Sequence, residues 1–239
     1  MKNSQVVEFV TPSVSVPRRK LLWVVSCCFA IAGCGNVGDS TAPAERVSAA
    51  PQSSDAISSP GGPLSGKIKF KTGDGDTAFS LKPEEDGAKL VNADERELAR
   101  FNLNGSKLKI KGPDDNVLGY VIASDGKLKI KDSEQEKELW RLQQQSDGDW
   151  KLEDGREQLI YKIKVREYGF EIEDATEHSV FKVKLKEGKT SIRNASDQTL
   201  YYTKDQVPTL ATTCLGFESI KNLPLQAGLM TMLIIFHGR

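Results

Sequence analysis

The sequence contains few of the side chains that usually carry catalysis or bind metals. It has two histidines, His178 and His237, and of its four cysteines Cys214 alone lies outside the N-terminal region. No GxSxG, HExxH, CxxC, P-loop or GxGxxG motif is present, so the usual signatures of nucleophilic, zinc and nucleotide chemistry are missing. We therefore expect no enzyme activity, no metal and no cofactor. We expect both histidines to be exposed and unpaired, and Cys214 to be a buried apolar thiol.

The chain also lacks an excess of either charge. Its 33 basic residues are balanced by 33 acidic residues, whereas a general nucleic-acid binder carries a strong positive excess. Nucleic acid is therefore excluded as a partner. The acidic turns that begin at Gly73, Gly112 and Ser146 do not have the ligand spacing of a calcium loop. Asp, Asn and Gly instead suit the turns of β-hairpins.

No apolar run near the N-terminus is long enough to cross a membrane. The run from Leu21 to Ala32 has 12 residues, whereas a spanning helix needs about 20. Arg18, Arg19 and Lys20 precede it and small residues close it, which is typical of a secretory signal peptide. We predict that residues 1–33 are such a signal. The letters PRRKLL also partly match a twin-arginine export signal, so the Sec and twin-arginine routes both stay open.

The end of this segment, Ile31-Ala32-Gly33-Cys34, resembles the bacterial lipobox. The resemblance implies cleavage between Gly33 and Cys34, diacylation of the Cys34 thiol, and acylation of the new amino terminus. One acyl chain binds a membrane only marginally, whereas two or three hold it firmly. Gly35 follows instead of an aspartate, which in the enterobacterial sorting pattern favours the outer membrane. The resemblance therefore predicts a lipid-anchored protein of the cell envelope; an ordinary signal with a chance cysteine after it is the alternative.

Residues 34–65 contain almost no large apolar side chain. Serine, alanine, proline and glycine dominate this segment, which cannot bury enough apolar surface to fold. A flexible chain of about 31 residues has a reach of roughly 30 Å. We predict a disordered linker that holds a folded domain away from the lipid headgroups.

From Gly66 onward the chain becomes a series of short alternating segments, each introduced by a glycine. The spacing of about 20 residues indicates an internal repeat. The leading glycines are Gly66, Gly87, Gly105, Gly126, Gly148, Gly169 and Gly188. In the fourth unit a strand begins at Lys127 and a second strand begins at Leu139 after a polar turn, so each unit predicts a β-hairpin. Because side chains alternate across a strand, one face is apolar and the other carries lysines.

Up to seven hairpins supply about twelve to fourteen strands. An open antiparallel sheet of that size leaves unprotected edges, which favours closure. We therefore predict a mainly β fold, a closed antiparallel barrel of about twelve strands. Such a barrel is too wide for its own side chains to fill.

The segment from Leu223 to Phe236 can fill the barrel. It is apolar on all sides, which for a helix indicates burial, and it is too short to span a membrane. We predict that residues 66–239 form one barrel domain with this hydrophobic helix through its centre.

This arrangement resembles the tubby C-terminal fold, which is shared by the LURP-one-related proteins and, by similarity, the phospholipid scramblases. The residues that carry the resemblance are the glycine-led hairpins from Gly66 to Asp205 and the apolar C-terminal segment. The resemblance implies an alternative function, a lipid-binding or lipid-handling module.

Lysine stripes on the predicted outer face are the remaining candidate site. The candidate face for anionic lipid or envelope components consists of Lys107, Lys109, Lys127, Lys129 and Lys131. The alternative is an ordinary solvated surface, because residues 66–239 carry 28 basic and 29 acidic residues once the five basic and four acidic residues of 1–65 are set aside. Acids such as Glu134, Glu136, Glu171 and Glu173 are then expected to pair with many of the lysines.

Three functions follow from these patterns. We favour a non-catalytic binding or structural lipoprotein whose barrel presents its outer face or loops to envelope components. The lipid-handling module is the alternative. An envelope hydrolase is disfavoured because the catalytic constellations are missing.

Overall fold

The computed structural model describes residue 64 and residues 66–237, and in this range it shows a closed antiparallel barrel. The strands are β1 (Ile68–Thr72), β2 (Thr77–Glu84), β3 (Gly87–Asn92), β4 (Glu97–Asn104), β5 (Lys107–Lys111), β6 (Val117–Ser124), β7 (Lys127–Lys131), β8 (Glu138–Gln144), β9 (Trp150–Asp154), β10 (Leu159–Arg166), β11 (Gly169–Asp174), β12 (Ser179–Lys186), β13 (Lys189–Asn194) and β14 (Thr199–Thr203).

Every strand pairs with its neighbours along the chain, and β1 pairs with β14 to close the barrel. The predicted closed barrel is confirmed. It has fourteen strands within the described residues, instead of about twelve, because all seven glycine-led units form complete hairpins.

The seven hairpins repeat the same local geometry. Within each unit the strand register shifts near the turn, as at a β-bulge. One residue of each turn has a positive φ, and we call it the left-handed position; the seven are Gly75, Glu95, Asp115, Gln135, Glu157, Glu177 and Asp197. In five of the seven turns, an Asp or Asn before the turn accepts backbone N–H groups, as Asp174 does from Thr176 and His178. Of the acidic turns named above, the one that begins at Ser146 has such a cap, in which the Asp147 side chain accepts the Asp149 backbone N–H at 3.1 Å.

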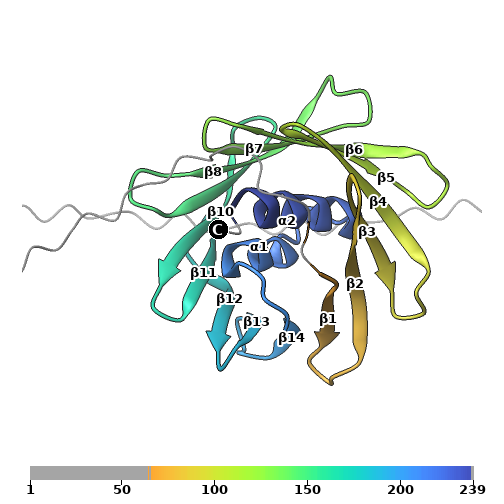
Figure 1. The fold of residues 1–239 in the computed structure, drawn as a ribbon. Coiled ribbons are helices and arrows are strands. Elements are labelled where there is room, and N and C mark those ends of the chain that lie inside the picture. Colours follow the sequence, from red (N-terminus) through yellow and green to blue (C-terminus); the bar gives the residue numbers. More distant parts are fainter. Residues whose placement is uncertain (1–63, 65, 238–239) are drawn as a thin grey trace, which may run out of the picture. The chain divides into compact units, whose positions relative to one another are not determined.

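Two helices and a short 3₁₀ segment fill the interior (Figure 1). They are α1 (Thr209–Thr213), η1 (Cys214–Gly216) and α2 (Leu223–His237). Helix α2 packs against strands β3 to β7, and α1 packs against β11 to β13. The predicted central helix is confirmed, whereas α1 and η1 had no sequence signal.

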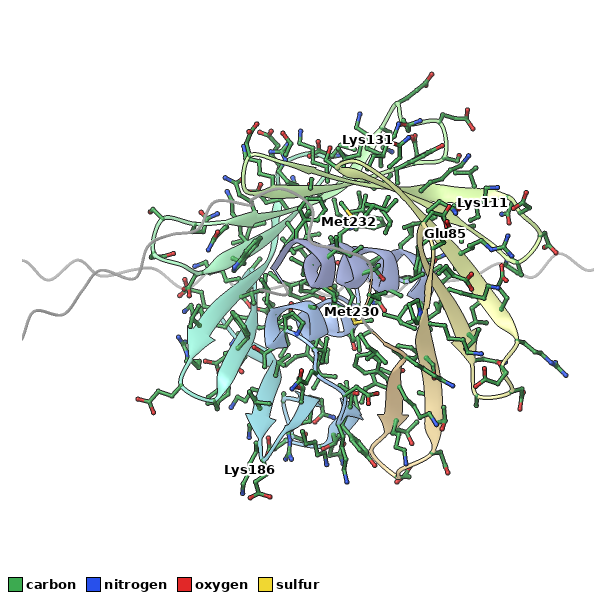
Figure 2. All side chains as sticks on the ribbon, in the orientation of Figure 1. Glu85, Lys111, Lys131, Lys186, Met230 and Met232 are labelled. Carbon is green, nitrogen blue, oxygen red and sulfur yellow. The ribbon has the colours of Figure 1, made fainter. Side chains whose placement is uncertain are left out.

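The side chains of α2 pack tightly against the barrel wall. Leu229, Met230, Met232 and Leu233 are each 0% exposed, and the two methionines lie inside the barrel in Figure 2. Thr231, on the same helix, donates its hydroxyl to the Ala227 carbonyl at 2.7 Å, so its buried polar group is satisfied.

The predictions for the N-terminal region fall almost entirely outside the described residues. The predicted signal peptide and Cys34 lie outside the described residues, as does nearly all of the predicted linker; Leu64 is the exception and is buried against the barrel core. Cys214 is fully buried, as expected, and burial raises the pKa of its thiol. Within residues 66–237 no helix has the length and apolarity needed to cross a membrane.

Candidate anion-binding surface

The outward-facing lysines of strands β9 to β12 are neutralised by carboxylates. Lys151, Lys162, Lys164 and Lys184 each lie 2.7 Å from an acidic oxygen, their partners being Glu153, Glu177, Glu173 and Asp197. A surface depression of about 310 Å³ on this wall includes three of these paired lysines. This wall is an ordinary solvated face.

The acids named in the sequence prediction behave in two ways. Glu171 pairs with Arg166 at 2.9 Å, and Glu173 pairs with Lys164. Glu134 and Glu136 form no ion pair with any described residue. The expected pairing is therefore confirmed on β11 and wrong in the turn between β7 and β8, where both acids point into solvent.

The left-handed position supplies much of this neutralisation. Its side chain extends over the outer face and meets a basic residue. Five of the seven positions are acidic, and their basic partners are Lys67 and Lys82 for Glu95, Lys111 for Asp115, Arg141 for Glu157, Lys162 for Glu177, and Lys184 and Arg193 for Asp197.

The lysine partners stabilise the ionised form of these acids. Hydrogen bonds from Lys67 and Lys82 lower the pKa of Glu95 to about 2. The pKa values of Asp115, Glu177 and Asp197 are lowered for the same reason, by Lys111, Lys162 and Lys184 respectively. A lowered carboxyl pKa is expected where an ammonium group lies within hydrogen-bonding distance.

Two units depart from this pattern, because a neutral residue takes the place of the acid. Gly75 and Gln135 occupy the left-handed position. In both places the neighbouring strand presents a tyrosine on the outer face: a Cβ added to Gly75 would lie 3.7 Å from the Tyr202 hydroxyl, and Gln135 lies beside Tyr120.

The departure at Gln135 lies within the lysine face predicted from the sequence. Strand register places Lys109, Tyr120 and Lys131 side by side across β5, β6 and β7. Lys107 lies 5.6 Å from the Tyr120 ring centroid and donates to the Gln135 side-chain oxygen at 3.1 Å. Figure 2 shows Lys131 pointing away from the barrel, and its ammonium donates to the Gln135 carbonyl at 3.0 Å.

The other predicted lysines differ in their partners. Lys129 pairs with Glu138 at 3.0 Å. The side chains of Lys109 and Lys127 form no ion pair or hydrogen bond with any residue that the structure describes. A depression of about 450 Å³ lies over β4 to β6 and includes Lys107, Lys109 and Tyr120. Its one acid, Asp86, accepts a hydrogen bond from the Asn102 side-chain amide at 2.7 Å. Three of the five predicted lysines, Lys107, Lys109 and Lys131, thus lie beside Tyr120 or Gln135. Lys129 lies opposite Ile122, and Lys127 lies opposite Ser124 at the strand end.

The departure at Gly75 lies near a cleft of about 390 Å³ at the seam between β1 and β14. We call it the seam cleft. Its lining residues are Lys67, Lys69, Lys71, Tyr202, Thr203, Lys204 and Asp205. Among the described residues, no carboxylate lies within ion-pair distance of Lys69, Lys71 or Lys204. Lys189 lies 4.1 Å above the Tyr202 ring.

The one acid of the seam cleft is held by the backbone. Asp205 accepts the Lys69 backbone N–H at 2.7 Å and the Thr203 hydroxyl at 3.4 Å. This contact joins the strands where their regular pairing, made by Lys71 with Tyr202 and Thr72 with Tyr201, has ended.

The sequence prediction missed the seam cleft. Its basic residues come from the first and last strands, and only barrel closure brings them together. A signal was nevertheless present, because Gly75 replaces the acid found at the same position of five other units.

Nothing in the described residues forms a metal centre. No group of three or more His, Cys, Asp or Glu side chains in this part of the chain could hold a metal ion. His178 is exposed as expected, but the expectation that it is unpaired was wrong, because its Nδ1 lies 2.8 Å from the Thr176 hydroxyl.

No protein-family model, no curated protein and no solved structure matches the chain. The function must therefore be inferred from the surface of the barrel.

Proposed function

We propose that the chain is a lipid-anchored protein of the bacterial cell envelope, held at the outer membrane through Cys34, and that its barrel is a non-catalytic module that binds anionic ligands. The observation that carries the binding role is the cluster around Tyr120, where Lys107, Lys109 and Lys131 gather without a carboxylate partner among the described residues. Uncompensated positive charge beside a depression favours an anionic partner.

The filled interior supports binding at the outer surface. Helices α1 and α2 occupy the barrel, and the core side chains of α2 have no exposure. A ligand that reaches the barrel from solvent therefore meets the outer wall first.

The alternative is a lipid-binding module of the tubby-like sort, in which the anionic ligand is a lipid headgroup. The lysines of the cluster around Tyr120 suit a phosphate group on a lipid as well as one on a polymer. The barrel departs from the tubby pattern in its fourteen strands and its second interior helix.

The anchor is tested by Cys34→Ala. We expect this variant to accumulate as uncleaved precursor and to take up no label from palmitate, because the acylated thiol is missing. Cells expressing Cys27→Ala serve as the control, since that cysteine leaves with the signal and its loss should not change labelling. Continued labelling of the Cys34→Ala protein would exclude the anchor.

The binding role is tested by Lys107→Gln/Lys109→Gln in the mature protein, reconstituted in nanodiscs of zwitterionic lipid. Polyphosphate and alginate serve as phosphate and carboxylate probes, and co-sedimentation with phosphatidylglycerol vesicles tests the lipid alternative. Exposed charge pairs are worth about 0.2–1 kcal/mol each, so we expect affinity to fall about two- to thirtyfold.

The matched control is Lys162→Gln/Lys164→Gln, which removes the same charge from lysines already paired with Glu177 and Glu173. Charges beyond about 8 Å are largely screened at physiological salt, so the control should bind almost normally. An equal loss in both variants, or no binding of any probe by the unaltered protein, contradicts the proposed role.

A further inference from the structure

We infer that the seam cleft is a second anion-binding site, equivalent by the internal repeat to the site around Tyr120, and that the barrel uses the two sites to bridge linear polyanions that carry repeated phosphate or carboxylate groups. This inference rests on the proposed function, because it takes the Tyr120 site as the first of the pair. It adds a site outside the candidate lysine face of β5 and β7, in which a lysine stripe of β1 joins residues of β14.

The two sites are built alike. Each centres on a tyrosine of an even-numbered strand, Tyr202 on β14 and Tyr120 on β6. The next odd strand places a lysine directly opposite the tyrosine, namely Lys71 beside Tyr202 and Lys131 beside Tyr120. The preceding odd strand places a lysine over the ring, namely Lys189 at 4.1 Å from the centroid and Lys107 at 5.6 Å.

The absence of an acid at the left-handed position explains why both sites stay positively charged. An acid there neutralises a basic residue in five units, as Asp197 does by pairing with Lys184 and Arg193. Gly75 has no side chain, and Gln135 offers only neutral oxygens. The lysines around both tyrosines are therefore available to an anion from outside the barrel.

The seam cleft has the shape as well as the charge of a binding site. Its volume of about 390 Å³ is in the range of ligand pockets. Lys69, Lys71 and Lys204 line it without a carboxylate partner among the described residues, while Lys67 is paired with Glu95. Asp205 is the one acid in the lining, and its Oδ2 accepts hydrogen bonds from the protein itself.

The positions of the two sites favour a polymer over a membrane surface. Strand β14 lies eight strands from β6 in one direction around the barrel and six in the other. Figure 1 shows β6 and β14 on opposite sides of the two helices. One flat bilayer cannot touch both outer walls at once, whereas two polymer chains, or two stretches of one long chain, can.

The test is a count of binding sites in the mature, lipid-anchored protein in zwitterionic nanodiscs, by titration calorimetry with short-chain polyphosphate. We expect two bound molecules per barrel in the unaltered protein. Lys69→Gln/Lys71→Gln and Lys107→Gln/Lys109→Gln should each keep one site at its original affinity and bind about two- to thirtyfold more weakly at the other, and the combination of all four changes should weaken both sites. Lys162→Gln/Lys164→Gln should keep both sites.

A second variant tests the role of the left-handed position directly. Gly75→Asp restores the acid of the other units, although the φ of 97° at Gly75 exceeds the 63° and 59° of Asp115 and Asp197, so the change adds some backbone strain. We expect it to abolish binding at the seam cleft alone, with thermal unfolding measured alongside to check the fold. Repeating the titration with alginate shows whether carboxylate polymers are bound in the same way.

The outcomes separate this inference from the proposed function. One bound molecule in the unaltered protein, whose affinity falls in Lys107→Gln/Lys109→Gln and is unchanged in Lys69→Gln/Lys71→Gln, would overturn the second site and leave the proposed function standing. No polyanion binding by the unaltered protein would overturn both. With long polyphosphate, light scattering should show cross-linked particles for the unaltered protein and not for either double variant; equal scattering would overturn bridging.

Discussion

At the residue scale, the left-handed turn position links the backbone of the repeat to its surface charge. A non-glycine residue with φ near +60° is uncommon, and the strain favours residues such as Asn and Asp. Here Glu95, Glu157 and Glu177 also adopt it, and each forms an ion pair with a basic residue on the outer face. The ion pair thus accompanies a conformation that the residue alone would disfavour.

Glu95→Gln tests this link through its pH dependence. Lys67 and Lys82 lower the pKa of Glu95 from 4.5 to about 2 in the folded protein. The stabilisation is therefore complete above the unfolded pKa and is lost as the pH falls through about 2, because only the unfolded chain binds the proton readily above that value. We expect Glu95→Gln to lower the melting temperature at pH 7 and to match the unaltered protein near pH 2.

Glu85→Gln is the matched control, because Glu85 is an exposed turn residue with no ion pair to any described residue. Melting curves recorded at pH 7, 4.5, 3 and 2 should show no effect of this change at any pH. A difference between Glu95→Gln and the unaltered protein that stays constant down to pH 2 would show that the Glu95 carboxylate charge is not what stabilises the turn.

At the element scale, the sequence predicted what local patterns determine. Alternation and the repeat-leading glycines gave the hairpins, as in the fourth unit, whose strands begin at Lys127 and Glu138 against predicted starts at Lys127 and Leu139. The predicted helix Leu223 to Phe236 is α2, which ends one residue later. Helix α1 has five residues and no side-chain cap, so its conformation depends on packing inside the barrel and not on local signals.

The two candidate sites also differ in how far local patterns predict them. Lys107, Lys109, Lys129 and Lys131 belong to consecutive units, so alternation alone placed them on one face. The residues of the seam cleft come from opposite ends of the barrel sequence: Lys71 and Tyr202 become neighbours only when β1 pairs with β14. Such long-range pairing is decided by closure of the whole sheet, which no local pattern encodes.

At the scale of the whole molecule, the barrel and its central helix need each other. A fourteen-stranded cylinder is too wide to be filled by its own wall, and α2 supplies four large apolar side chains with no exposure, Leu229, Met230, Met232 and Leu233. Burying each contributes about 1.5–3 kcal/mol, so together they contribute about as much as the typical net stability of a domain, roughly 5–15 kcal/mol.

We therefore expect a chain that lacks residues 223–239 to lose its cooperative thermal transition, because the wall would enclose water against apolar side chains. Leu229→Asp or Leu233→Asp should cost several kcal/mol, since neither site offers a partner for a buried carboxylate. Ile234→Asp is the matched control on the same helix, because Ile234 is only partly buried, and its melting temperature should fall less. The measurement is calorimetric melting of the truncated chain and the three Asp variants beside the unaltered protein. A truncated chain that melts cooperatively at an unchanged temperature would show that α2 is an accessory to the barrel and not its core.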